Sequence, residues 1–129
     1  MKRVNIPAET IWEDEVGYSR AVKIGNVIEV SGTAAVDNNQ IVGKENAYEQ
    51  TKFILEKIKK TLESLGSGMN DVVRTRIYVT DISRWAEIGK AHGEFFNNIK
   101  PATSMVEVKS LIDPHMLVEI EATAVINID

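Results

Sequence analysis

The chain has 129 residues, of which 43% are hydrophobic and 26% are charged, and it contains no cysteine. This length and composition describe one soluble globular domain over residues 1–129, with a sizeable core. The lack of cysteine excludes disulfides, thiolate metal sites and thiol catalysis. A net charge of −4, without a basic cluster beyond Lys57, Lys59 and Lys60, disfavours nucleic acid as a partner.

Targeting features are also missing from the sequence. No apolar run reaches the roughly 18 to 20 residues that a membrane helix needs. The segment from Met1 to Pro7 lacks the basic-then-apolar plan of a signal peptide. We therefore expect a cytoplasmic protein that has no membrane partner.

A β-hairpin is the strongest local prediction. Ala21 to Ile24 and Val27 to Ser31 are β-prone runs, and Gly25-Asn26 between them tolerates the positive φ of a tight turn. Ser31-Gly32 then opens a stretch of small residues, whose missing bulk suits close backbone approach or a ligand wall. A polar turn over residues 37–40 follows, and we expect a third short strand before the first helix.

Two helices are predicted from apolar residues that recur at helical spacing. The first runs from Asn46 to Leu65 and is stopped by Gly66-Ser67-Gly68. The second runs from about Arg84 to Asn98, and Asp81 or Ser83 can cap it. The expected buried stripes are Ala47, Ile54, Leu55, Ile58, Leu62 and Leu65 in the first helix and Trp85, Ile88, Phe95 and Phe96 in the second.

Between the helices, Val72 to Thr80 alternates in the manner of a strand with one buried face. The buried face is expected to carry Val73, Thr75, Ile77 and Val79, and the other face Arg74, Arg76 and Tyr78.

Two last strands, about Ser104 to Val108 and Leu117 to Ile126, are predicted to point three carboxylates away from an apolar face. These carboxylates belong to Glu107, Glu119 and Glu121, and we expect the function to lie beside them. Glu119 and Glu121 are two residues apart, so their side chains share a face at a spacing of roughly 6.5 to 7 Å. Paired carboxylates raise one pKa, which suits a general acid or base.

The order of these elements predicts an α+β fold. Two helices can cover only one face of the sheet, yet the other face also carries apolar and mixed residues. The simplest cover for that face is another copy of the chain.

Several motifs resemble the YjgF/RidA family of reactive intermediate deaminases, also called endoribonuclease L-PSP. They lie at residues 17–21, Ser31-Gly32, residues 71–81, residues 94–96, and from Pro101-Ala102 through residues 119–122. The resemblance spans nearly the whole chain. It implies a chorismate-mutase-like fold, with a mixed β-sheet and two helices on one face. It also implies a homotrimer that binds small metabolites in clefts between subunits.

The resemblance further implies hydrolysis of small enamines or imines, such as 2-aminoacrylate, to a 2-oxo acid and ammonia. In the family an arginine directly after the Pro-Ala pair forks onto the substrate carboxylate, but this chain has Thr103 there. A family asparagine in the second helix is likewise Gly89, with His92 three residues on. We therefore expect a different substrate, and Arg76 is a candidate to replace the missing arginine.

The resemblance assigns the cleft glutamate, which positions or activates water, to Glu119 and a cleft-lining tyrosine to Tyr18. Tyr18, Ser31 or Thr103 is then expected to orient a polar substrate. Structural alternatives stay open: outward charges on a strand, or salt bridges to Arg74 or Arg76, for Glu107, Glu119 and Glu121, a packed helical residue for His92, and a hydrogen-bonded core residue for Tyr18.

Three classes of function compete, in the order of a deaminase-like hydrolase, a trimeric metabolite-binding protein without turnover, and a ribonuclease or translation inhibitor. The acidic charge disfavours the third class. We expect no cofactor, because the chain has no glycine-rich phosphate loop and no obvious Schiff-base lysine. We expect no metal, because His92 and His115 lack a ligand spacing.

Overall fold

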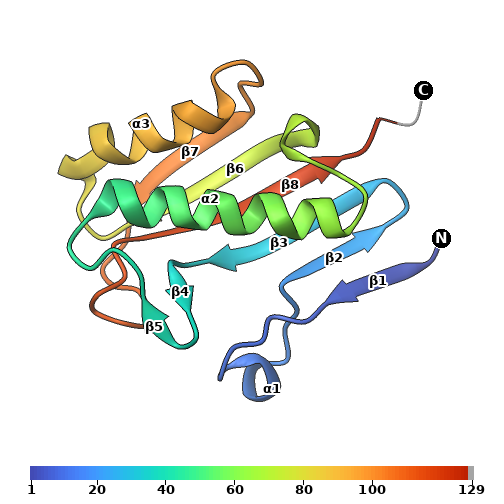
Figure 1. Ribbon diagram of the computed structural model, residues 1–129, viewed down its shortest axis with the longest axis horizontal. Coiled ribbons are helices and arrows are strands. Elements are labelled where there is room, and N and C mark those ends of the chain that lie inside the picture. The colour runs from blue at the N-terminus through green and yellow to red at the C-terminus, as the bar shows by residue number, and fades with distance from the viewer. Residues whose placement is uncertain (128–129) are drawn as a thin grey trace.

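A six-stranded mixed sheet carries the fold, with its strands in the order β1-β2-β3-β8-β6-β7 (Figure 1). This computed structural model describes residues 1–127. Neighbouring strands are antiparallel except β6 and β7, which run parallel because α3 crosses over between them. The strands are β1 Arg3–Ile6, β2 Ala21–Ile24, β3 Val27–Thr33, β6 Val72–Val79, β7 Ala102–Glu107 and β8 Val118–Val125.

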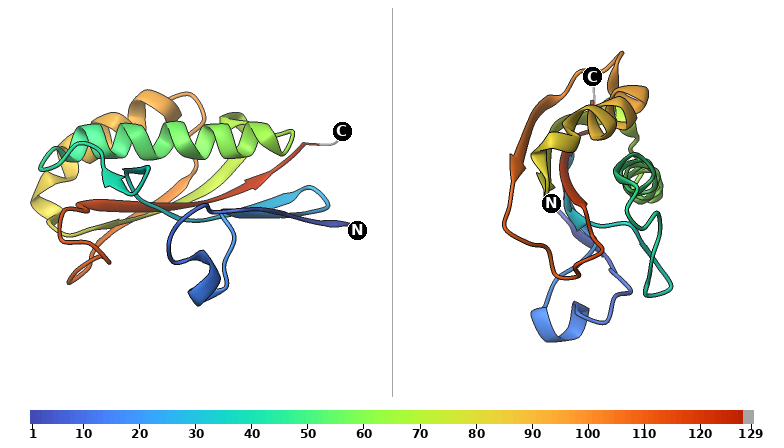
Figure 2. Two further views of the ribbon diagram at one scale, coloured as in Figure 1. Left: turned by 60° about the horizontal axis from the view of Figure 1, so that its bottom comes forward. Right: turned by 90° about the vertical axis from the view of Figure 1, so that its left-hand side faces the viewer.

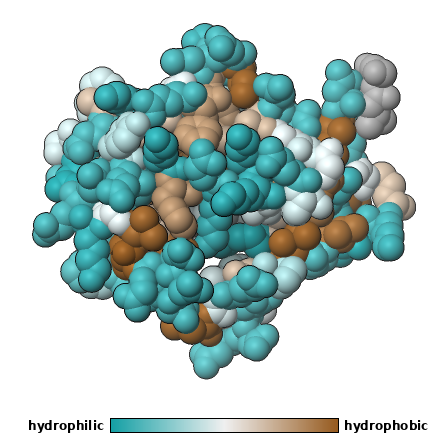
Figure 3. Space-filling view, viewed as in Figure 1, coloured by the Kyte–Doolittle hydropathy of each residue, from teal (hydrophilic) through white to brown (hydrophobic). Residues whose placement is uncertain are grey.

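Two helices, α2 Ala47–Ser64 and α3 Trp85–Phe96, cover one face of this sheet, as the left panel of Figure 2 shows. The short helix α1 Glu13–Val16 lies on the opposite side, within the segment that joins β1 to β2. The α+β prediction, with a mixed sheet and two helices on one face, is therefore confirmed. Seen from the helix side, the surface is mostly hydrophilic with scattered apolar groups (Figure 3). Within residues 1–127, no helix has the length and apolarity to cross a bilayer.

The long helix α2 forms where its apolar spacing predicts. The Asn46 side chain caps it by accepting a hydrogen bond of 2.9 Å from the backbone nitrogen of Glu49. Gly66 follows its end with a left-handed φ of 79°, a conformation that favours glycine. The apolar stripe packs on β3 and β8 and is fully buried at Ile54, Leu55, Ile58 and Leu62.

The hairpin β2–β3 has the predicted turn, because Ile24 pairs with Val27 and Gly25 takes a φ of 60°. The third short strand is instead a small separate hairpin, β4 Val36–Asp37 and β5 Gln40–Ile41. The edge strand β1 was not predicted, because four residues alternate too briefly to stand out from a loop.

For two residues, the prediction of a buried side chain is wrong. Val73 is 47% exposed, because an irregularity in the β6–β8 pairing between Val72 and Arg74 puts Val72 into the core instead. Trp85 is 61% exposed at the first position of α3, and the buried residues of this helix are Ile88, Ala91 and Phe96.

Buried Gln50 fixes the loop between β7 and β8. Its amide nitrogen donates to the carbonyl oxygens of Gly43, at 3.1 Å, and His115, at 2.9 Å. Its amide oxygen accepts from the backbone nitrogen of Leu117 at 2.9 Å. A fully buried amide with three partners is well satisfied, so it holds residues 115–117 in place.

Candidate functional site

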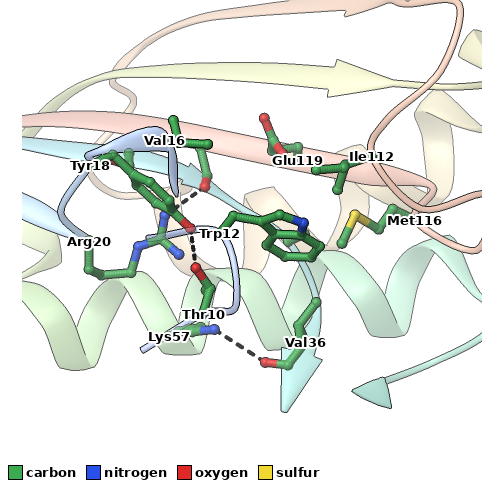
Figure 4. A pocket seen from close by; sticks show the side chains of 13 residues that line it. Thr10, Trp12, Val16, Tyr18, Arg20, Val36, Lys57, Ile112, Met116 and Glu119 are labelled. Carbon is green, nitrogen blue, oxygen red and sulfur yellow. Dashed lines mark hydrogen bonds between the residues drawn. The ribbon is translucent and has the colours of Figure 1, made fainter. Parts of the chain in front are cut away.

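A cavity of about 290 Å³ lies where the 10–20 segment, the end of β3, α2 and the loop before β8 meet (Figure 4). These four elements come from separate parts of the chain, and Gln50 holds the end of the loop in place. The lining residues are Thr10, Trp12, Val16, Tyr18, Arg20, Ser31, Gly32, Ala34, Val36, Lys57, Ile112, Met116 and Glu119. Four predicted site residues thus come together: Tyr18, Ser31, Gly32 and Glu119.

Glu119 supplies the only acidic side chain among the described residues that line this cavity. Burial raises the pKa of its carboxyl above the ordinary value, Arg20 opposes that rise, and Glu121 adds to it. The predicted carboxylate pairing thus acts in the expected direction, but burial is the larger cause. No donor among the described residues hydrogen-bonds this carboxylate, so it is available to a ligand or a water molecule.

Gly32 leaves room for that carboxylate. A Cβ atom on Gly32 would lie 2.5 Å from Oε2 of Glu119 and 2.9 Å from its Cδ. Real Cβ atoms essentially never approach so closely, so any larger residue here displaces the Glu119 side chain. The small residues at Ser31-Gly32 therefore form part of the cavity wall and leave room for the Glu119 carboxylate.

Tyr18 and Ser31 have hydroxyl groups that are held in place. The Tyr18 hydroxyl hydrogen-bonds the hydroxyl of Thr10, and the Ser31 hydroxyl donates to the Ser19 carbonyl oxygen at 2.6 Å. Both oxygens keep lone pairs that can accept a further hydrogen bond. Tyr18 is thus hydrogen-bonded, as the structural alternative expects, and it also lines the cavity, as the functional interpretation expects.

Arg20 and Lys57 also line the cavity, and sequence analysis did not select either as a site residue. Arg20 is only 5% exposed, and its Nη2 donates to the Gly32 carbonyl oxygen at 2.7 Å. Nζ of Lys57 donates to the Val36 carbonyl oxygen at 3.2 Å. Burial lowers the pKa of both cations. A sequence signal existed for Arg20, because it lies within residues 17–21, one of the motifs that carry the family resemblance.

The remaining predicted residues lie elsewhere. Thr75 Oγ1 is 2.9 Å from Nε2 of His92 and 2.8 Å from Oγ1 of Thr103, where α3 packs on β6 and β7. Burial lowers the pKa of His92, whose ring also packs against Phe96 with centroids 4.6 Å apart. We call Thr75, His92 and Thr103 the α3 cluster. Gly89 is one turn before His92, and the space beside it is open.

Arg76 and Glu121 lie on the face of the sheet away from the helices. Nε of Arg76 is 3.8 Å from Oε1 of Glu121, which also accepts a hydrogen bond of 2.8 Å from Tyr78. Both line a separate shallow hollow that reaches Ser31 but not Glu119. The salt-bridge alternative is therefore met for Glu121, and Arg76 does not reach the cavity within the described chain.

The expectation that Glu107 shares a face with Glu119 is wrong. Strand β7 pairs with β6 rather than with β8, and Glu107 lies opposite the buried Val79. It therefore faces the helix side, where it accepts a hydrogen bond of 3.0 Å from the backbone nitrogen of Ile82. This contact ties the start of the α3 segment to the sheet edge.

Residues 11–126 match the family model of endoribonuclease L-PSP. The chain belongs to the YjgF/RidA family. A crystal structure of a member of the YjgF/YER057c/UK114 family from Mycobacterium tuberculosis is 46% identical, with a TM-score of 0.88 over 97% of this chain and 100% of the other.

Other members of the YjgF/RidA family agree with this assignment. A RutC family protein from Pyrococcus abyssi is 40% identical over 109 residues, which are 83% of this chain and 84% of the relative. A YjgF family structure from Neisseria meningitidis is 29% identical, with a TM-score of 0.80 over 97% of this chain and 95% of the other. The described part of this YjgF/RidA chain holds no group of three or more His, Cys, Asp or Glu placed for a metal ion.

Proposed function

We propose that this protein is a deaminase-like hydrolase that acts on a small imine, an enamine or a related nitrogen metabolite, with Glu119 activating water. The observation that carries the proposal is the placement of Glu119, whose pKa is raised, in one cavity with Tyr18 and Ser31. A carboxyl that titrates nearer to neutral pH can both accept and return a proton during one turnover.

The reaction needs one acid–base group and one water molecule. Water adds to the carbon of the C=N bond while its proton passes to the Glu119 carboxylate. Glu119 returns that proton to nitrogen, which gives a carbinolamine. It then takes the proton of the new hydroxyl group and passes it to the same nitrogen, so that the C–N bond breaks and ammonia leaves as the C=O bond forms. An enamine first takes a proton on carbon to become the imine. Tyr18 and Ser31 orient the substrate through their fixed oxygens.

We further propose that the working unit is a homotrimer, with its clefts between subunits. Two features support this assembly. The sheet face away from the helices carries the partly exposed Arg76 and Glu121, and the edge strand β7 exposes Val106 at 47%. A second subunit that covers this face would bring its own α3 cluster and Gly89 toward the cavity, joining the two groups of predicted residues that lie apart within one chain.

A metabolite-binding protein without turnover is the second candidate, and Thr103 favours it. This residue stands where the family's carboxylate-binding arginine is expected. Its hydroxyl is already engaged with Thr75 and with the Pro101 carbonyl oxygen, at 3.1 Å from the latter. A ribonuclease stays disfavoured by the net charge of −4.

The test is release of ammonia and 2-oxo acid from freshly generated 2-aminoacrylate. We expect Glu119→Gln to lower turnover by about 10² to 10⁴, the usual contribution of a general acid–base group. Glu121→Gln is the matched control, because it makes the same change on the same strand face but lies outside the cavity. Full turnover in Glu119→Gln would contradict the assigned role.

The three classes separate in the same preparation. A hydrolase forms product, whereas a binding protein shows saturable binding of the ligand with no product. A ribonuclease cleaves RNA in a manner that weakens steeply with salt. Wild-type protein that cleaves RNA and leaves 2-aminoacrylate unchanged would overturn the proposal.

A further inference from the structure

We propose that Arg20 and Lys57 bind the carboxylate of a small organic acid inside the cavity, in place of the arginine that Thr103 replaces. This inference rests on the proposed function, because it names the residues of the same site that hold the substrate. The carboxylate lies on these two cations, and the reacting carbon lies beside Glu119.

Arg20 is the first support. Its side chain is 5% exposed, yet its buried Nε has no hydrogen-bond partner among the described residues. Buried polar groups are nearly always hydrogen-bonded, because leaving a buried donor unpaired costs about 1–3 kcal/mol. Within residues 1–127, only Nη2 has an acceptor, the Gly32 carbonyl oxygen. A guanidinium that lines a cavity with donors to spare fits the planar fork of a carboxylate.

The charge balance of the cavity is the second support. Arg20 and Lys57 line it together, and they lie close enough that Arg20 helps to lower the pKa of Lys57. Glu119 is the only acid among the described lining residues, and its pKa is raised. Glu13 acts on Arg20, and Glu9 and Asp37 act on Lys57, but these three acids do not line the cavity. The cavity therefore carries a net positive charge that an anion neutralises.

The shape and the walls of the cavity select the rest of the ligand. Trp12, Val16, Ile112 and Met116 form an apolar side, and the space is about 290 Å³. This volume suits a small metabolite rather than a nucleotide or a peptide. Arg20 and Glu119 interact electrostatically across the same cavity, so a carboxylate on Arg20 places the neighbouring C=N carbon toward Glu119.

The test is a binding titration that needs no turnover. The chain has two tryptophans, and Trp85→Phe leaves Trp12 in the cavity wall as the only one. The probes are 2-oxobutanoate, a stable product of the proposed reaction class, and its uncharged counterpart 2-oxobutanamide. We expect saturable quenching of Trp12 by the acid, with a Kd about tenfold or more below that for the amide.

Variants in the same background locate the anion. Arg20→Gln is expected to raise the Kd for 2-oxobutanoate about tenfold to hundredfold, and Lys57→Gln severalfold to about tenfold. Lys59→Gln is the matched control, because it removes the same charge from an exposed position on the same helix. If Arg20→Gln fails to fold, Lys57→Gln at a partly buried position and the comparison of acid with amide still decide the question.

Equal affinity for the acid and the amide, no saturable response to the acid, or identical Kd values for Lys57→Gln and Lys59→Gln would each overturn the inference. Charge-selective binding without turnover of 2-aminoacrylate would keep the inference and reject the proposed hydrolase. Turnover that depends on Glu119 but is unaffected by Lys57→Gln and Arg20→Gln would keep the proposed hydrolase and overturn the inference.

Discussion

The Glu119 carboxylate lies against Gly32 in the cavity wall. The carboxylate occupies the space where a side chain at position 32 would lie. A Cβ atom added there would be 2.5 Å from a carboxylate oxygen of Glu119. Gly32 has an ordinary backbone conformation rather than one of positive φ. Glycine is therefore required here for the room it leaves rather than for its flexibility.

We expect Gly32→Ala to lower catalytic turnover about tenfold or more, because the Glu119 carboxylate must rotate away from its present place. The free energy of unfolding should change by less than about 1 kcal/mol, since the atom that yields is the end of a flexible side chain. Turnover of 2-aminoacrylate and urea unfolding check the two parts. A variant with wild-type turnover would show that the carboxylate position is unimportant.

The raised pKa of Glu119 predicts how stability depends on pH. Well below about pH 4.5, the carboxyl is protonated in both the folded and the unfolded chain, so its burial does not lower the free energy of unfolding through ionisation. As the pH rises from there through the folded pKa, the unfolded chain loses the proton first, and the folded state is progressively destabilised. Because Gln does not ionise, Glu119→Gln should gain stability relative to wild type between pH 4 and pH 8.

Urea midpoints at both pH values test this prediction, with Glu121→Gln as the control. Glu121 is only a minor cause of the raised Glu119 pKa and is itself hydrogen-bonded by Tyr78, so its loss should give a clearly smaller gain with rising pH than Glu119→Gln does. A stability difference for Glu119→Gln that stays constant or shrinks as the pH rises would contradict the burial of this carboxyl.

At the scale of the elements, local patterns predicted the fold well and neighbouring strands less well. Alternation in β8 correctly places Glu119 and Glu121 on one face, opposite Tyr78 and Arg76. The predicted face for the Glu107 side chain was wrong, because that face depends on how β7 pairs after the α3 crossover. No local pattern encodes this register. The predicted burial of Val73 was wrong, because an irregularity in the strand pairing shifts the alternation of buried and exposed residues.

The α3 cluster predicts a second pH effect. Burial lowers the pKa of His92, so the folded chain keeps this ring neutral when the unfolded ring, with a pKa of about 6.5, has taken a proton. The stabilising contribution is therefore present above about pH 6.5 and is lost as the pH falls toward the folded pKa. We expect His92→Gln to show a shallower loss of stability than wild type between pH 7.5 and pH 5.5.

His115→Gln is the control for this measurement, because the second histidine of the chain is exposed in the loop before β8. It should lose stability on acidification as wild type does. Parallel curves for wild type and His92→Gln would mean that His92 does not contribute.

At the scale of the whole molecule, the cavity was only partly predictable. Ser31 and Gly32 were found from their small size and Glu119 from the alternation of its strand, whereas Tyr18 and the role of Glu119 came from the family resemblance. Arg20 and Lys57 were not, because their meeting depends on the packing of α2 against the segment before β2. Lys57 borders the apolar stripe of α2 and looks like an ordinary solvated lysine in the sequence.

The proposed homotrimer predicts a solution mass of roughly three times the 14.4 kDa of the chain. Light scattering coupled to size-exclusion chromatography measures it directly. Val106→Glu, which places a charge on the exposed edge strand β7, should shift the protein toward smaller species. A wild-type mass of 14.4 kDa over a range of concentrations would rule out sites shared between subunits.

The central claim is that this chain hydrolyses a small imine or enamine carboxylate without the arginine that the family places at position 103. The most direct measurement is the release of ammonia and 2-oxo acid from fresh 2-aminoacrylate by wild type and by Thr103→Arg. We predict turnover by wild type, with at most a small gain in Thr103→Arg, because Arg20 and Lys57 already hold the carboxylate. Activity that is absent from wild type and appears only in Thr103→Arg would contradict the claim.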